Sequence, residues 1–338
     1  MPSTPVVLRI RDDKTPKRKR IREMVVWCGS SVNVSNGQES SVVILVPDAR
    51  NGHRDGYRGQ ARPISPTTSD SMKRTFLESA KEHKPLLGSF LSFNTAYAAQ
   101  ILARCGFDWL MIDMEHAPLS AQEATNMVHS TVAASQGTCM PIIRVPSHGV
   151  EWIKWALDSG ADGIIIPMVN NKTEMDLIIK RALYPPAGAR SSGPFRTPFA
   201  DLDPAATMSR YRTQTVASTV VLPMIESVEG VENADAIMST PGVDGIFVGP
   251  VDLRSSMGFA GPDGDEEQYL NALDKLLAIG KRLNKPVGIL LSPTAPQRQI
   301  EMGFDYFLMT GDADLMSRAA MTMLAATGDL IKSSRGQA

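Results

Sequence analysis

The chain lacks most features that mark secreted, membrane or nucleic-acid-binding proteins. Its 338 residues include only three cysteines, Cys28, Cys105 and Cys139, which share no short spacing, so neither a disulfide framework nor a zinc cluster is indicated. No apolar run reaches the ~20 residues that a membrane-spanning helix needs. The formal net charge of -1 offers no general attraction for nucleic acid or an anionic membrane. We therefore expect a cytoplasmic protein that acts on small molecules.

Residues 1–71 differ in composition from the rest of the chain. They hold 12 Lys and Arg against 7 Asp and Glu, and only VVILV (42–46) resembles a strand. Such a segment buries too little apolar surface to offset the entropy of ordering it, so we expect a largely disordered basic extension. The cluster PKRKR is typical of nuclear-import signals, but a solvated basic tail is the simpler interpretation. The folded domain is expected to begin at Met72 and to span residues 72–330.

Short, almost wholly apolar runs recur from residue 86 onward, separated by stretches with helical periodicity. Runs without alternation suit parallel strands that are buried on both faces. Eight such units in about 250 residues predict an α/β fold, a (β/α)8 barrel. A doubly wound sheet is the alternative, but no glycine-rich nucleotide motif follows any run. The eight runs span residues 86–92, 107–113, 140–145, 162–169, 218–226, 243–249, 286–292 and 305–311.

Ionisable residues follow several of these runs directly. The carboxyl ends of all strands in a barrel open at one mouth, so we expect these side chains to meet there. Each one alone has a structural explanation, as a buried ion pair or a helix cap, but six converging on one mouth favour an active site. The six are Asp113, Glu115 and His116 after the second run, Arg144 after the third, Glu226 after the fifth and Asp252 after the sixth.

The chemistry of this set is that of an enolate-forming lyase. Glu226 and Asp252 offer only oxygen ligands, which suit Mg²⁺ or Mn²⁺, with Co²⁺ as a further option, better than zinc. A metal with two protein ligands has room to chelate a 2-oxo acid and to act as a Lewis acid on its carbonyl. Arg144 is placed to donate to the developing enolate oxygen, and His116 is the expected proton carrier.

Two other classes of function stay open at this point. A Schiff-base aldolase needs a lysine at the mouth, but Lys172 lies beyond the fourth strand, and Lys281 and Lys285 precede the seventh strand at the opposite end. A non-catalytic barrel scaffold has no need for buried charges that cost free energy. Of the remaining histidines, His129 is interpreted as a core or interface residue, and His148 as a loop-capping residue or a substrate contact.

Several segments together resemble the HpcH/HpaI aldolase family over about residues 84–325. They are IDMEHAP, PIIRVP, ADGIIIPMV, LYPPAGAR, MIES and GPVDLRSSMGF. The resemblance implies a barrel of the phosphoenolpyruvate/pyruvate superfamily type, a divalent metal and a homo-oligomer. It also implies cleavage of 4-hydroxy-2-oxo acids to pyruvate and an aldehyde through a metal-held pyruvate enolate. Oxaloacetate decarboxylation, or a macrophomate synthase-like reaction through the same enolate, is the alternative.

The resemblance also implies a role for individual residues. The family's base corresponds to His116, its enolate-stabilising arginine to Arg144, and its metal ligands to Glu226 and Asp252. An aspartate that raises the basicity of the histidine corresponds to Asp158 in WALDSGADG. Because Asp158 is expected at the end of a helix, away from the mouth of its own barrel, it is expected to serve a neighbouring subunit.

This chain departs from the family pattern where the aldehyde is expected to bind. Met224 replaces a glutamine, Phe90 stands where a tryptophan is common, and Ser191 follows Arg190 where a glycine is usual. The metal and enolate residues match, whereas the aldehyde pocket is expected to differ. The expected substrate contacts are Arg144, Met224, Val251 and Asp252.

Overall fold

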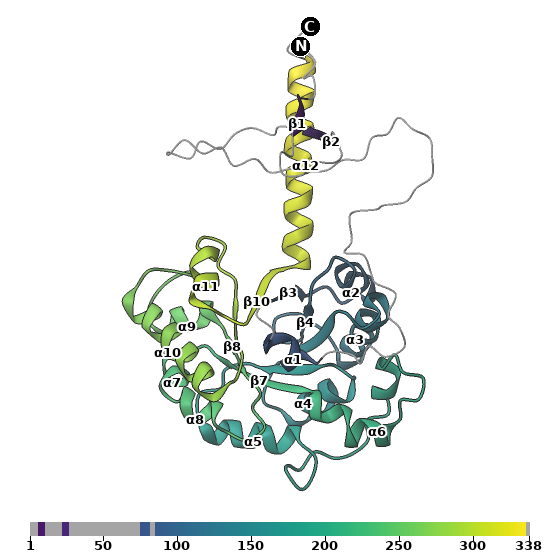
Figure 1. The fold of residues 1–338 in the computed structure, drawn as a ribbon, viewed down its shortest axis with the longest axis vertical. Helices are drawn as coiled ribbons and strands as arrows, with labels where there is room; N and C mark the ends of the chain where they lie inside the picture. The colour runs from purple at the N-terminus through teal and green to yellow at the C-terminus, as the bar shows by residue number, and fades with distance from the viewer. Residues whose placement is uncertain (1–5, 11–21, 27–74, 82–84, 336–338) are drawn as a thin grey trace, which may run out of the picture. The chain divides into compact units, whose positions relative to one another are not determined.

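The chain folds into two compact units, which are described separately. One consists of Gln60–Met316, and the other of Met1–Gly59 together with Ser317–Ala338. Figure 1 draws the chain as a ribbon; this computed structural model describes residues 6–10, 22–26, 75–81 and 85–335.

The unit that contains the N-terminus has two strands that the sequence did not predict. Strands β1 (Val6–Ile10) and β2 (Arg22–Val26) pair antiparallel. The same unit includes most of helix α12 (Asp312–Arg335). Our expectation of a single strand in the first 71 residues was wrong. Strands β1 and β2 are short and flank a strongly basic stretch, so their apolar pattern is difficult to recognise in the sequence. The expected strand at 42–46 lies outside the described residues.

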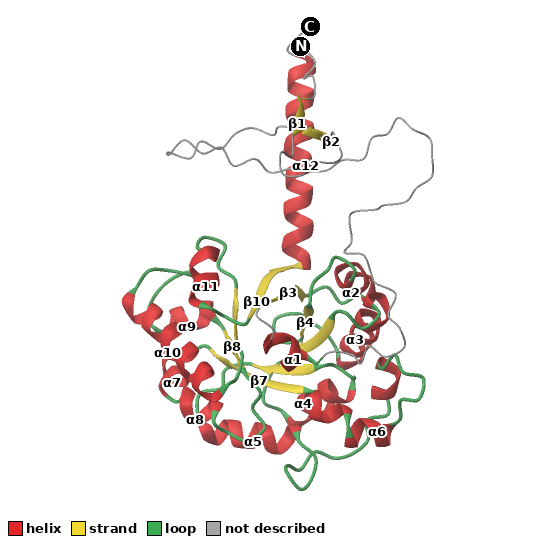
Figure 2. Ribbon diagram, viewed as in Figure 1, coloured by secondary structure: helices red, strands yellow, loops and turns green. Residues whose placement is uncertain are grey.

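The larger unit is a closed barrel of eight parallel strands, drawn in yellow in Figure 2. The strands follow their order in the sequence around the barrel, and β10 closes it by pairing with β3. Each predicted apolar run contains one of these strands, so the predicted (β/α)8 barrel is confirmed. The strands are β3 (Leu86–Leu91), β4 (Trp109–Asp113), β5 (Met140–Arg144), β6 (Gly163–Ile166), β7 (Val220–Ile225), β8 (Ile246–Val248), β9 (Val287–Leu290) and β10 (Tyr306–Gly311).

The helices between the strands cover the outside of the barrel (Figure 2). Of the stretches with helical periodicity, the one around Leu273 forms one long helix, whereas the one around Val231 forms two short helices that meet at Asn233. None of the described helices is both long and apolar enough to cross a membrane. The helices are α2 (Ala96–Ala103), α3 (Ala121–Ser135), α4 (Val150–Asp158), α5 (Lys172–Ala182), α6 (Met208–Thr213), α7 (Val228–Glu232), α8 (Ala234–Met238), α9 (Pro250–Ser256), α10 (Glu267–Leu283) and α11 (Pro296–Met302), with 3-10 turns at Thr197–Ala200 and Thr215–Ser218.

Aromatic side chains fill the barrel at the end where the strands begin. Trp109 and Tyr306, the first residues of β4 and β10, pack edge to face with ring centroids 5.8 Å apart. Phe76 of helix α1 (Phe76–Lys81) adds its ring 5.1 Å from that of Tyr306. At Gly88 a Cβ atom would lie 2.2 Å from the Trp109 ring, so glycine is required there. This end is packed shut, and the opposite end remains for the functional site.

Candidate active site

The six ionisable residues singled out in the sequence all lie at the carboxyl ends of the strands. Asp113 and Arg144 are the last residues of β4 and β5 and are partners in the register of these strands. Glu226 follows β7, and Asp252 lies in the first turn of α9, just after β8. The charges of Glu115, Asp252 and Arg144 all influence Glu226, which shows that these strand ends form one cluster.

Arg144 is held on two sides by carboxylates. Its Nε donates to Asp113 Oδ1 at 2.8 Å, and its Nη2 donates to Asp113 Oδ2 at 2.7 Å. Its Nη1 lies 3.0 Å from Glu115 Oε2. Burial by itself lowers the pKa of Arg144, but the hydrogen bonds and negative charge of Asp113 raise the pKa above its ordinary value. These contacts use three of five N–H groups, so two remain for a bound anion.

Asp113 also shapes the turn that follows β4. Its Oδ1 accepts a hydrogen bond from the backbone N–H of Glu115 at 3.0 Å, which is a local turn motif of aspartate. One carboxylate therefore fixes both the guanidinium of Arg144 and the backbone that carries Glu115 and His116.

His116 and Glu115 form the next pair. The Nε2 atom of His116 lies 3.7 Å from Glu115 Oε2, and 68% of the histidine side chain is exposed. Glu115 is half-buried, and burial raises its pKa although the positive charge of Arg144 opposes this. Glu115 therefore links the arginine to an accessible histidine.

Glu226 is a buried carboxylate, 4% exposed. Its Oε1 accepts a hydrogen bond from the Met168 backbone N–H at 2.6 Å. Burial raises the pKa of Glu226 to about 7, and the charges of Glu115 and Asp252 add to this rise. A Cβ atom at position 249 would lie 2.3 Å from Glu226 Oε2, so Gly249 leaves the space that this carboxylate occupies.

This donor set fits a divalent cation. A buried carboxylate with a raised pKa beside two further carboxylates is stabilised in its charged form by a positive ion. Glu226 and Asp252 supply oxygen atoms, as Mg²⁺ and Mn²⁺ prefer. Among the described residues there is no group of three or more His, Cys, Asp or Glu that could hold a metal ion.

Asp158 lies apart from this cluster, at the end of α4. It accepts a hydrogen bond from Nη2 of the buried Arg190 at 2.5 Å. A pocket of about 340 Å³ adjoins it, lined in part by Trp155, Phe195 and Arg196. The structure therefore does not bring Asp158 together with His116 within one chain.

The remaining sequence-predicted residues occupy varied positions. Met224 is buried in β7, and Val251 is exposed beside Asp252 at the start of α9. The exposed Lys172 pairs with Asp176 at 2.6 Å. Lys285 precedes β9 at the amino end of the barrel and donates to the backbone oxygen of Met238 at 2.6 Å. No lysine considered for Schiff-base chemistry lies in the carboxylate cluster.

The two other histidines contact backbone oxygens. The Nε2 of His129 lies 3.1 Å from the oxygen of Ser159, and burial lowers the pKa of this histidine. The Nε2 of His148 lies 2.7 Å from the oxygen of Pro167, which joins the loops after β5 and β6. The structure thus places His129 in a packing contact and His148 in a contact between loops, which agrees with the first interpretation given for each.

Sequence reasoning missed the contacts that hold the cluster in place. The Met168 N–H and the space left by Gly249 both position Glu226. Phe90 of β3 lies beneath Arg144, with the guanidinium carbon 5.8 Å from the ring centroid. A signal was available only for Gly249, because a glycine directly after a barrel strand indicates close approach to a neighbour.

Comparison with known proteins identifies the class of protein. Residues 86–303 match the HpcH/HpaI aldolase/citrate lyase family. The chain is 34% identical over 261 residues to a 4-hydroxy-2-oxo-heptane-1,7-dioate aldolase of Salmonella heidelberg (strain SL476), covering 76% of this chain and 95% of that protein. It is 37% identical over 242 residues to a hydroxypyruvate/pyruvate aldolase of Chromohalobacter salexigens, covering 69% and 90%.

A solved structure of macrophomate synthase is also similar, with a TM-score of 0.68 and 28% identity over 77% of this chain and 91% of that one. The fold, the cluster at the mouth and these matches define a carbon–carbon lyase that acts on small molecules. The chain belongs to the HpcH/HpaI aldolase/citrate lyase family, as the sequence segments indicated.

Proposed function

We propose that this lyase is a metal-dependent pyruvate aldolase that cleaves 4-hydroxy-2-oxo acids to pyruvate and an aldehyde. The observation that carries the proposal is the clamped Arg144 beside the carboxylates Glu226 and Asp252 at one barrel mouth. The similarity to a 4-hydroxy-2-oxo-heptane-1,7-dioate aldolase and to a hydroxypyruvate/pyruvate aldolase supports the substrate class.

Glu226 and Asp252 are proposed to hold Mg²⁺ or Mn²⁺, with Co²⁺ as a further option. When bound, such an ion polarises the 2-oxo carbonyl of the substrate as a Lewis acid. The Met168 N–H fixes one oxygen of Glu226, and Asp252 approaches from the neighbouring strand end. Val251, exposed beside Asp252, and Met224, in the strand before Glu226, are proposed as substrate-binding residues.

Arg144 is proposed to stabilise the negative charge that develops during cleavage. Its two remaining N–H groups donate to the oxygen of the 2-oxo group, which becomes the enolate oxygen. Asp113 prevents the guanidinium from turning away, since it binds Nε and Nη2 together. The donors are therefore aligned before the substrate arrives, and no reorganisation is needed when charge appears.

His116 is proposed to move the proton. It removes the proton of the 4-hydroxyl group, the C3–C4 bond breaks, and its electron pair forms the enolate of pyruvate while the aldehyde carbonyl forms. The enolate then takes a proton at C3 to give pyruvate. Glu115, 3.7 Å from His116 Nε2, stabilises the imidazolium that exists between these steps.

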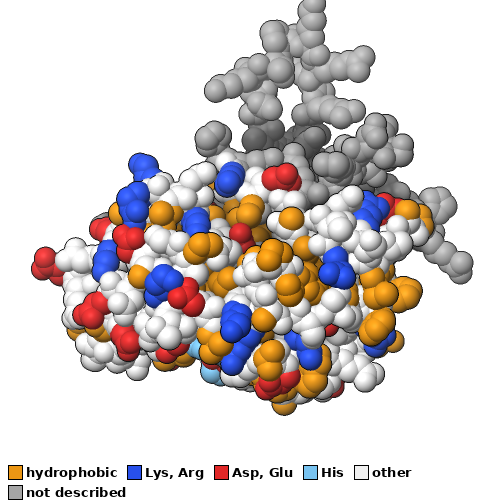
Figure 3. All heavy atoms as spheres, turned by 90° about the horizontal axis from the view of Figure 1, so that it is seen from below, with side chains coloured by type: hydrophobic (Ala, Val, Ile, Leu, Met, Phe, Trp, Pro, Cys, Tyr) orange, Lys and Arg blue, Asp and Glu red, His pale blue; other side chains and the backbone are white. Residues whose placement is uncertain are grey.

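Asp158 is proposed to act in the site of a neighbouring subunit of a homo-oligomer, where it raises the basicity of the histidine. Its distance from its own His116 cluster supports this, as does the exposed apolar surface near it. Phe195 beside the Asp158 pocket is 71% exposed. Figure 3 shows one face of the molecule on which hydrophobic side chains gather in patches, which is typical of protein interfaces. The cytoplasm remains the proposed location, and residues 72–330 the proposed catalytic domain.

Exchange of the pyruvate methyl protons with D₂O tests the proposal without knowledge of the aldehyde. We expect exchange with Mg²⁺ or Mn²⁺, its loss in EDTA, and its return when metal is added back. Absence of exchange with every divalent ion would overturn the aldolase proposal and favour the scaffold. Borohydride should trap no pyruvate adduct, since an adduct on Lys172 would instead indicate Schiff-base chemistry.

Oxaloacetate decarboxylation is a second candidate, favoured by the similarity to macrophomate synthase. This reaction forms the same enolate but needs no proton removal from a 4-hydroxyl group. Turnover of oxaloacetate should therefore be compared with that of a series of 4-hydroxy-2-oxo acids. Faster turnover of oxaloacetate than of every member of the series would favour the decarboxylase.

A further inference from the structure

The helix that carries Asp252 has few local means of fixing its orientation. Helix α9 is only seven residues long, and its N-cap residue, Gly249, has no side chain to cap it. Asp252 is exposed, so packing does not hold its side chain. Metal ligands nevertheless need defined positions, because coordination geometry is sensitive to small displacements. Leu253 packs α9 against the core, Ser256 Oγ accepts a hydrogen bond from the Val228 N–H, and one further contact sets the orientation of the helix.

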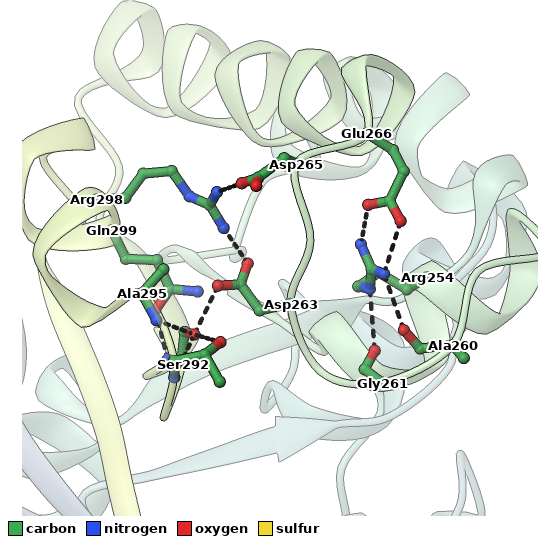
Figure 4. Close-up of polar contacts among 11 residues, drawn as sticks. Arg254, Ala260, Gly261, Asp263, Asp265, Glu266, Ser292, Ala295, Arg298 and Gln299 are labelled. Carbon is green, nitrogen blue, oxygen red and sulfur yellow. Dashed lines mark hydrogen bonds and ion pairs between the residues drawn. The ribbon is translucent and has the colours of Figure 1, made fainter. Parts of the chain in front are cut away.

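Arg254 supplies this contact. It lies on the same helix, and its side chain is only 3% exposed. Its Nε donates to the Gly261 oxygen at 3.0 Å, and its Nη2 donates to the Ala260 oxygen at 2.8 Å. Its Nη1 and Nη2 both donate to Glu266, at 2.5 and 3.0 Å (Figure 4). The loop between α9 and α10 thus wraps around one guanidinium.

Aromatic rings complete the surroundings of this side chain. The guanidinium carbon of Arg254 lies 5.0 Å from the ring centroid of Tyr269 and 5.6 Å from that of Phe259. Cations are attracted to aromatic faces, and a planar fork bound on several sides can adopt only one orientation. Arg254 is therefore a rigid anchor for the helix that carries it.

The loop that wraps Arg254 is itself fastened to the next βα unit. Asp263 accepts a hydrogen bond from Ser292 Oγ at 2.6 Å and pairs with Arg298 of α11 (Figure 4). Arg298 also pairs with Asp265. The Ser292 N–H donates to the buried Gln299 side chain at 2.7 Å. These contacts join the loop to the end of β9 and the start of α11, so Arg254 is anchored to a fixed part of the barrel.

Helix geometry connects this anchor to the metal ligand. Residues two positions apart on an α-helix project about 200° apart, so a side chain anchored at Arg254 leaves Asp252 on roughly the opposite side. Helix α9 begins directly after β8, which pairs with β7, and its N-cap Gly249 lies against the Glu226 carboxylate, so the start of α9 borders the carboxylate cluster.

We propose that Arg254 is a positioning residue that fixes α9 so that Asp252 is presented to the divalent cation. The inference rests on the proposed role of Asp252 as a ligand. It adds a residue that touches neither the metal nor the substrate and that acts through the orientation of α9. Residues that support metal ligands in this way typically contribute 10- to 100-fold in metal affinity or activity.

The test compares an arginine of this network with one outside it, by titrating the metal-free protein with Mn²⁺ alone. Arg254→Gln should weaken Mn²⁺ binding by at least about tenfold. Arg282→Gln is the matched control, because it removes an arginine–aspartate ion pair, with Asp235, that contacts neither α9 nor the loop around Arg254. Its Mn²⁺ affinity should stay within about twofold of the wild-type value, as expected for a residue outside the support of the ligand. A purely structural role would lower the melting temperature of both variants and leave both affinities equal.

A further set of variants separates this proposal from the proposed function. Asp252→Ala should lose most Mn²⁺ binding, and unchanged binding would overturn the ligand assignment itself. Loss of binding in Asp252→Ala with wild-type affinity in Arg254→Gln would overturn only the positioning role. If Arg254→Gln fails to fold, Glu266→Gln replaces it: this variant removes the charge that pairs with Arg254, and several-fold weaker Mn²⁺ binding is expected. Wild-type affinity in Glu266→Gln would then contradict the proposal.

Discussion

The charged Glu226 side chain is predicted to destabilise the metal-free protein. Its carboxylate is buried and lies near Glu115 and Asp252, which together raise its pKa to about 7 from an ordinary value of 4.5. Replacing it with glutamine removes the charge but keeps an oxygen that can accept from the Met168 N–H. We therefore expect Glu226→Gln to be more stable than the wild type when no metal is present.

The magnitude and its pH window follow from the raised pKa. Below pH 4.5 the group is protonated in both the folded and the unfolded chain, so it costs nothing. As the pH rises toward 7, the unfolded chain ionises first and the folded state loses stability, by about 3 kcal/mol once the pH exceeds 7. For a domain of this size, that corresponds to a melting temperature roughly 6 °C or more higher for Glu226→Gln at pH 8. The gain should be much smaller near pH 5.

Scanning calorimetry in EDTA at pH 8 and pH 5 measures this difference. Glu123→Gln serves as a control of opposite sign, because hydrogen bonds from Ser120 lower the pKa of Glu123 and its charge is stabilising. Adding Mg²⁺ should raise the melting temperature of the wild type and leave Glu226→Gln unchanged. Equal melting temperatures of Glu226→Gln and wild type at both pH values would refute the reasoning.

Three further predictions concern the roles of single residues and segments. His116→Ala should slow aldol cleavage by roughly 10²- to 10⁴-fold while sparing Mn²⁺ binding, and oxaloacetate decarboxylation should fall less. In Arg144→Ala the two activities should instead fall together, and equal losses in His116→Ala would contradict the assigned base. A chain that starts at Met72 should keep its kcat, and a large loss of activity would show that residues before it belong to the catalytic domain. Mixing His116→Ala with Asp158→Ala protein should restore activity that neither has alone, and no recovery would place Asp158 outside the neighbouring site.

The barrel was predictable because the sequence pattern of a buried strand followed by a helix is repeated along the chain. Each strand is a short apolar run, and eight of them in order admit few other folds. Convergence of the site residues then followed from topology alone, since Arg144 and Glu226 come at the ends of different strands. The break between α7 and α8 was not predictable, because apolar spacing continues through Asn233, whose side chain instead donates to the backbone oxygen of Asn170.

The contacts within the site were harder to predict than the identity of the residues that form it. The sequence shows that Asp113 and Glu115 lie near a histidine, but their pairing with Arg144 depends on the register of β4 against β5. The network around Arg254 depends on how an irregular loop folds back, which no periodic pattern encodes. Long-range hydrogen bonds of this kind come from the tertiary structure.

The strand register that joins Asp113 to Arg144 implies that substitutions are tolerated differently in the barrel wall and at its rim. The arginine clamp belongs to the hydrogen-bonded wall of the barrel, so a one-residue slip of β5 would turn its side chain to the other face and dismantle the barrel with it. Val251 instead occupies a helix-start position that can change without altering any strand. Directed evolution toward new aldehydes should therefore accept substitutions at such rim positions and reject them at the clamp.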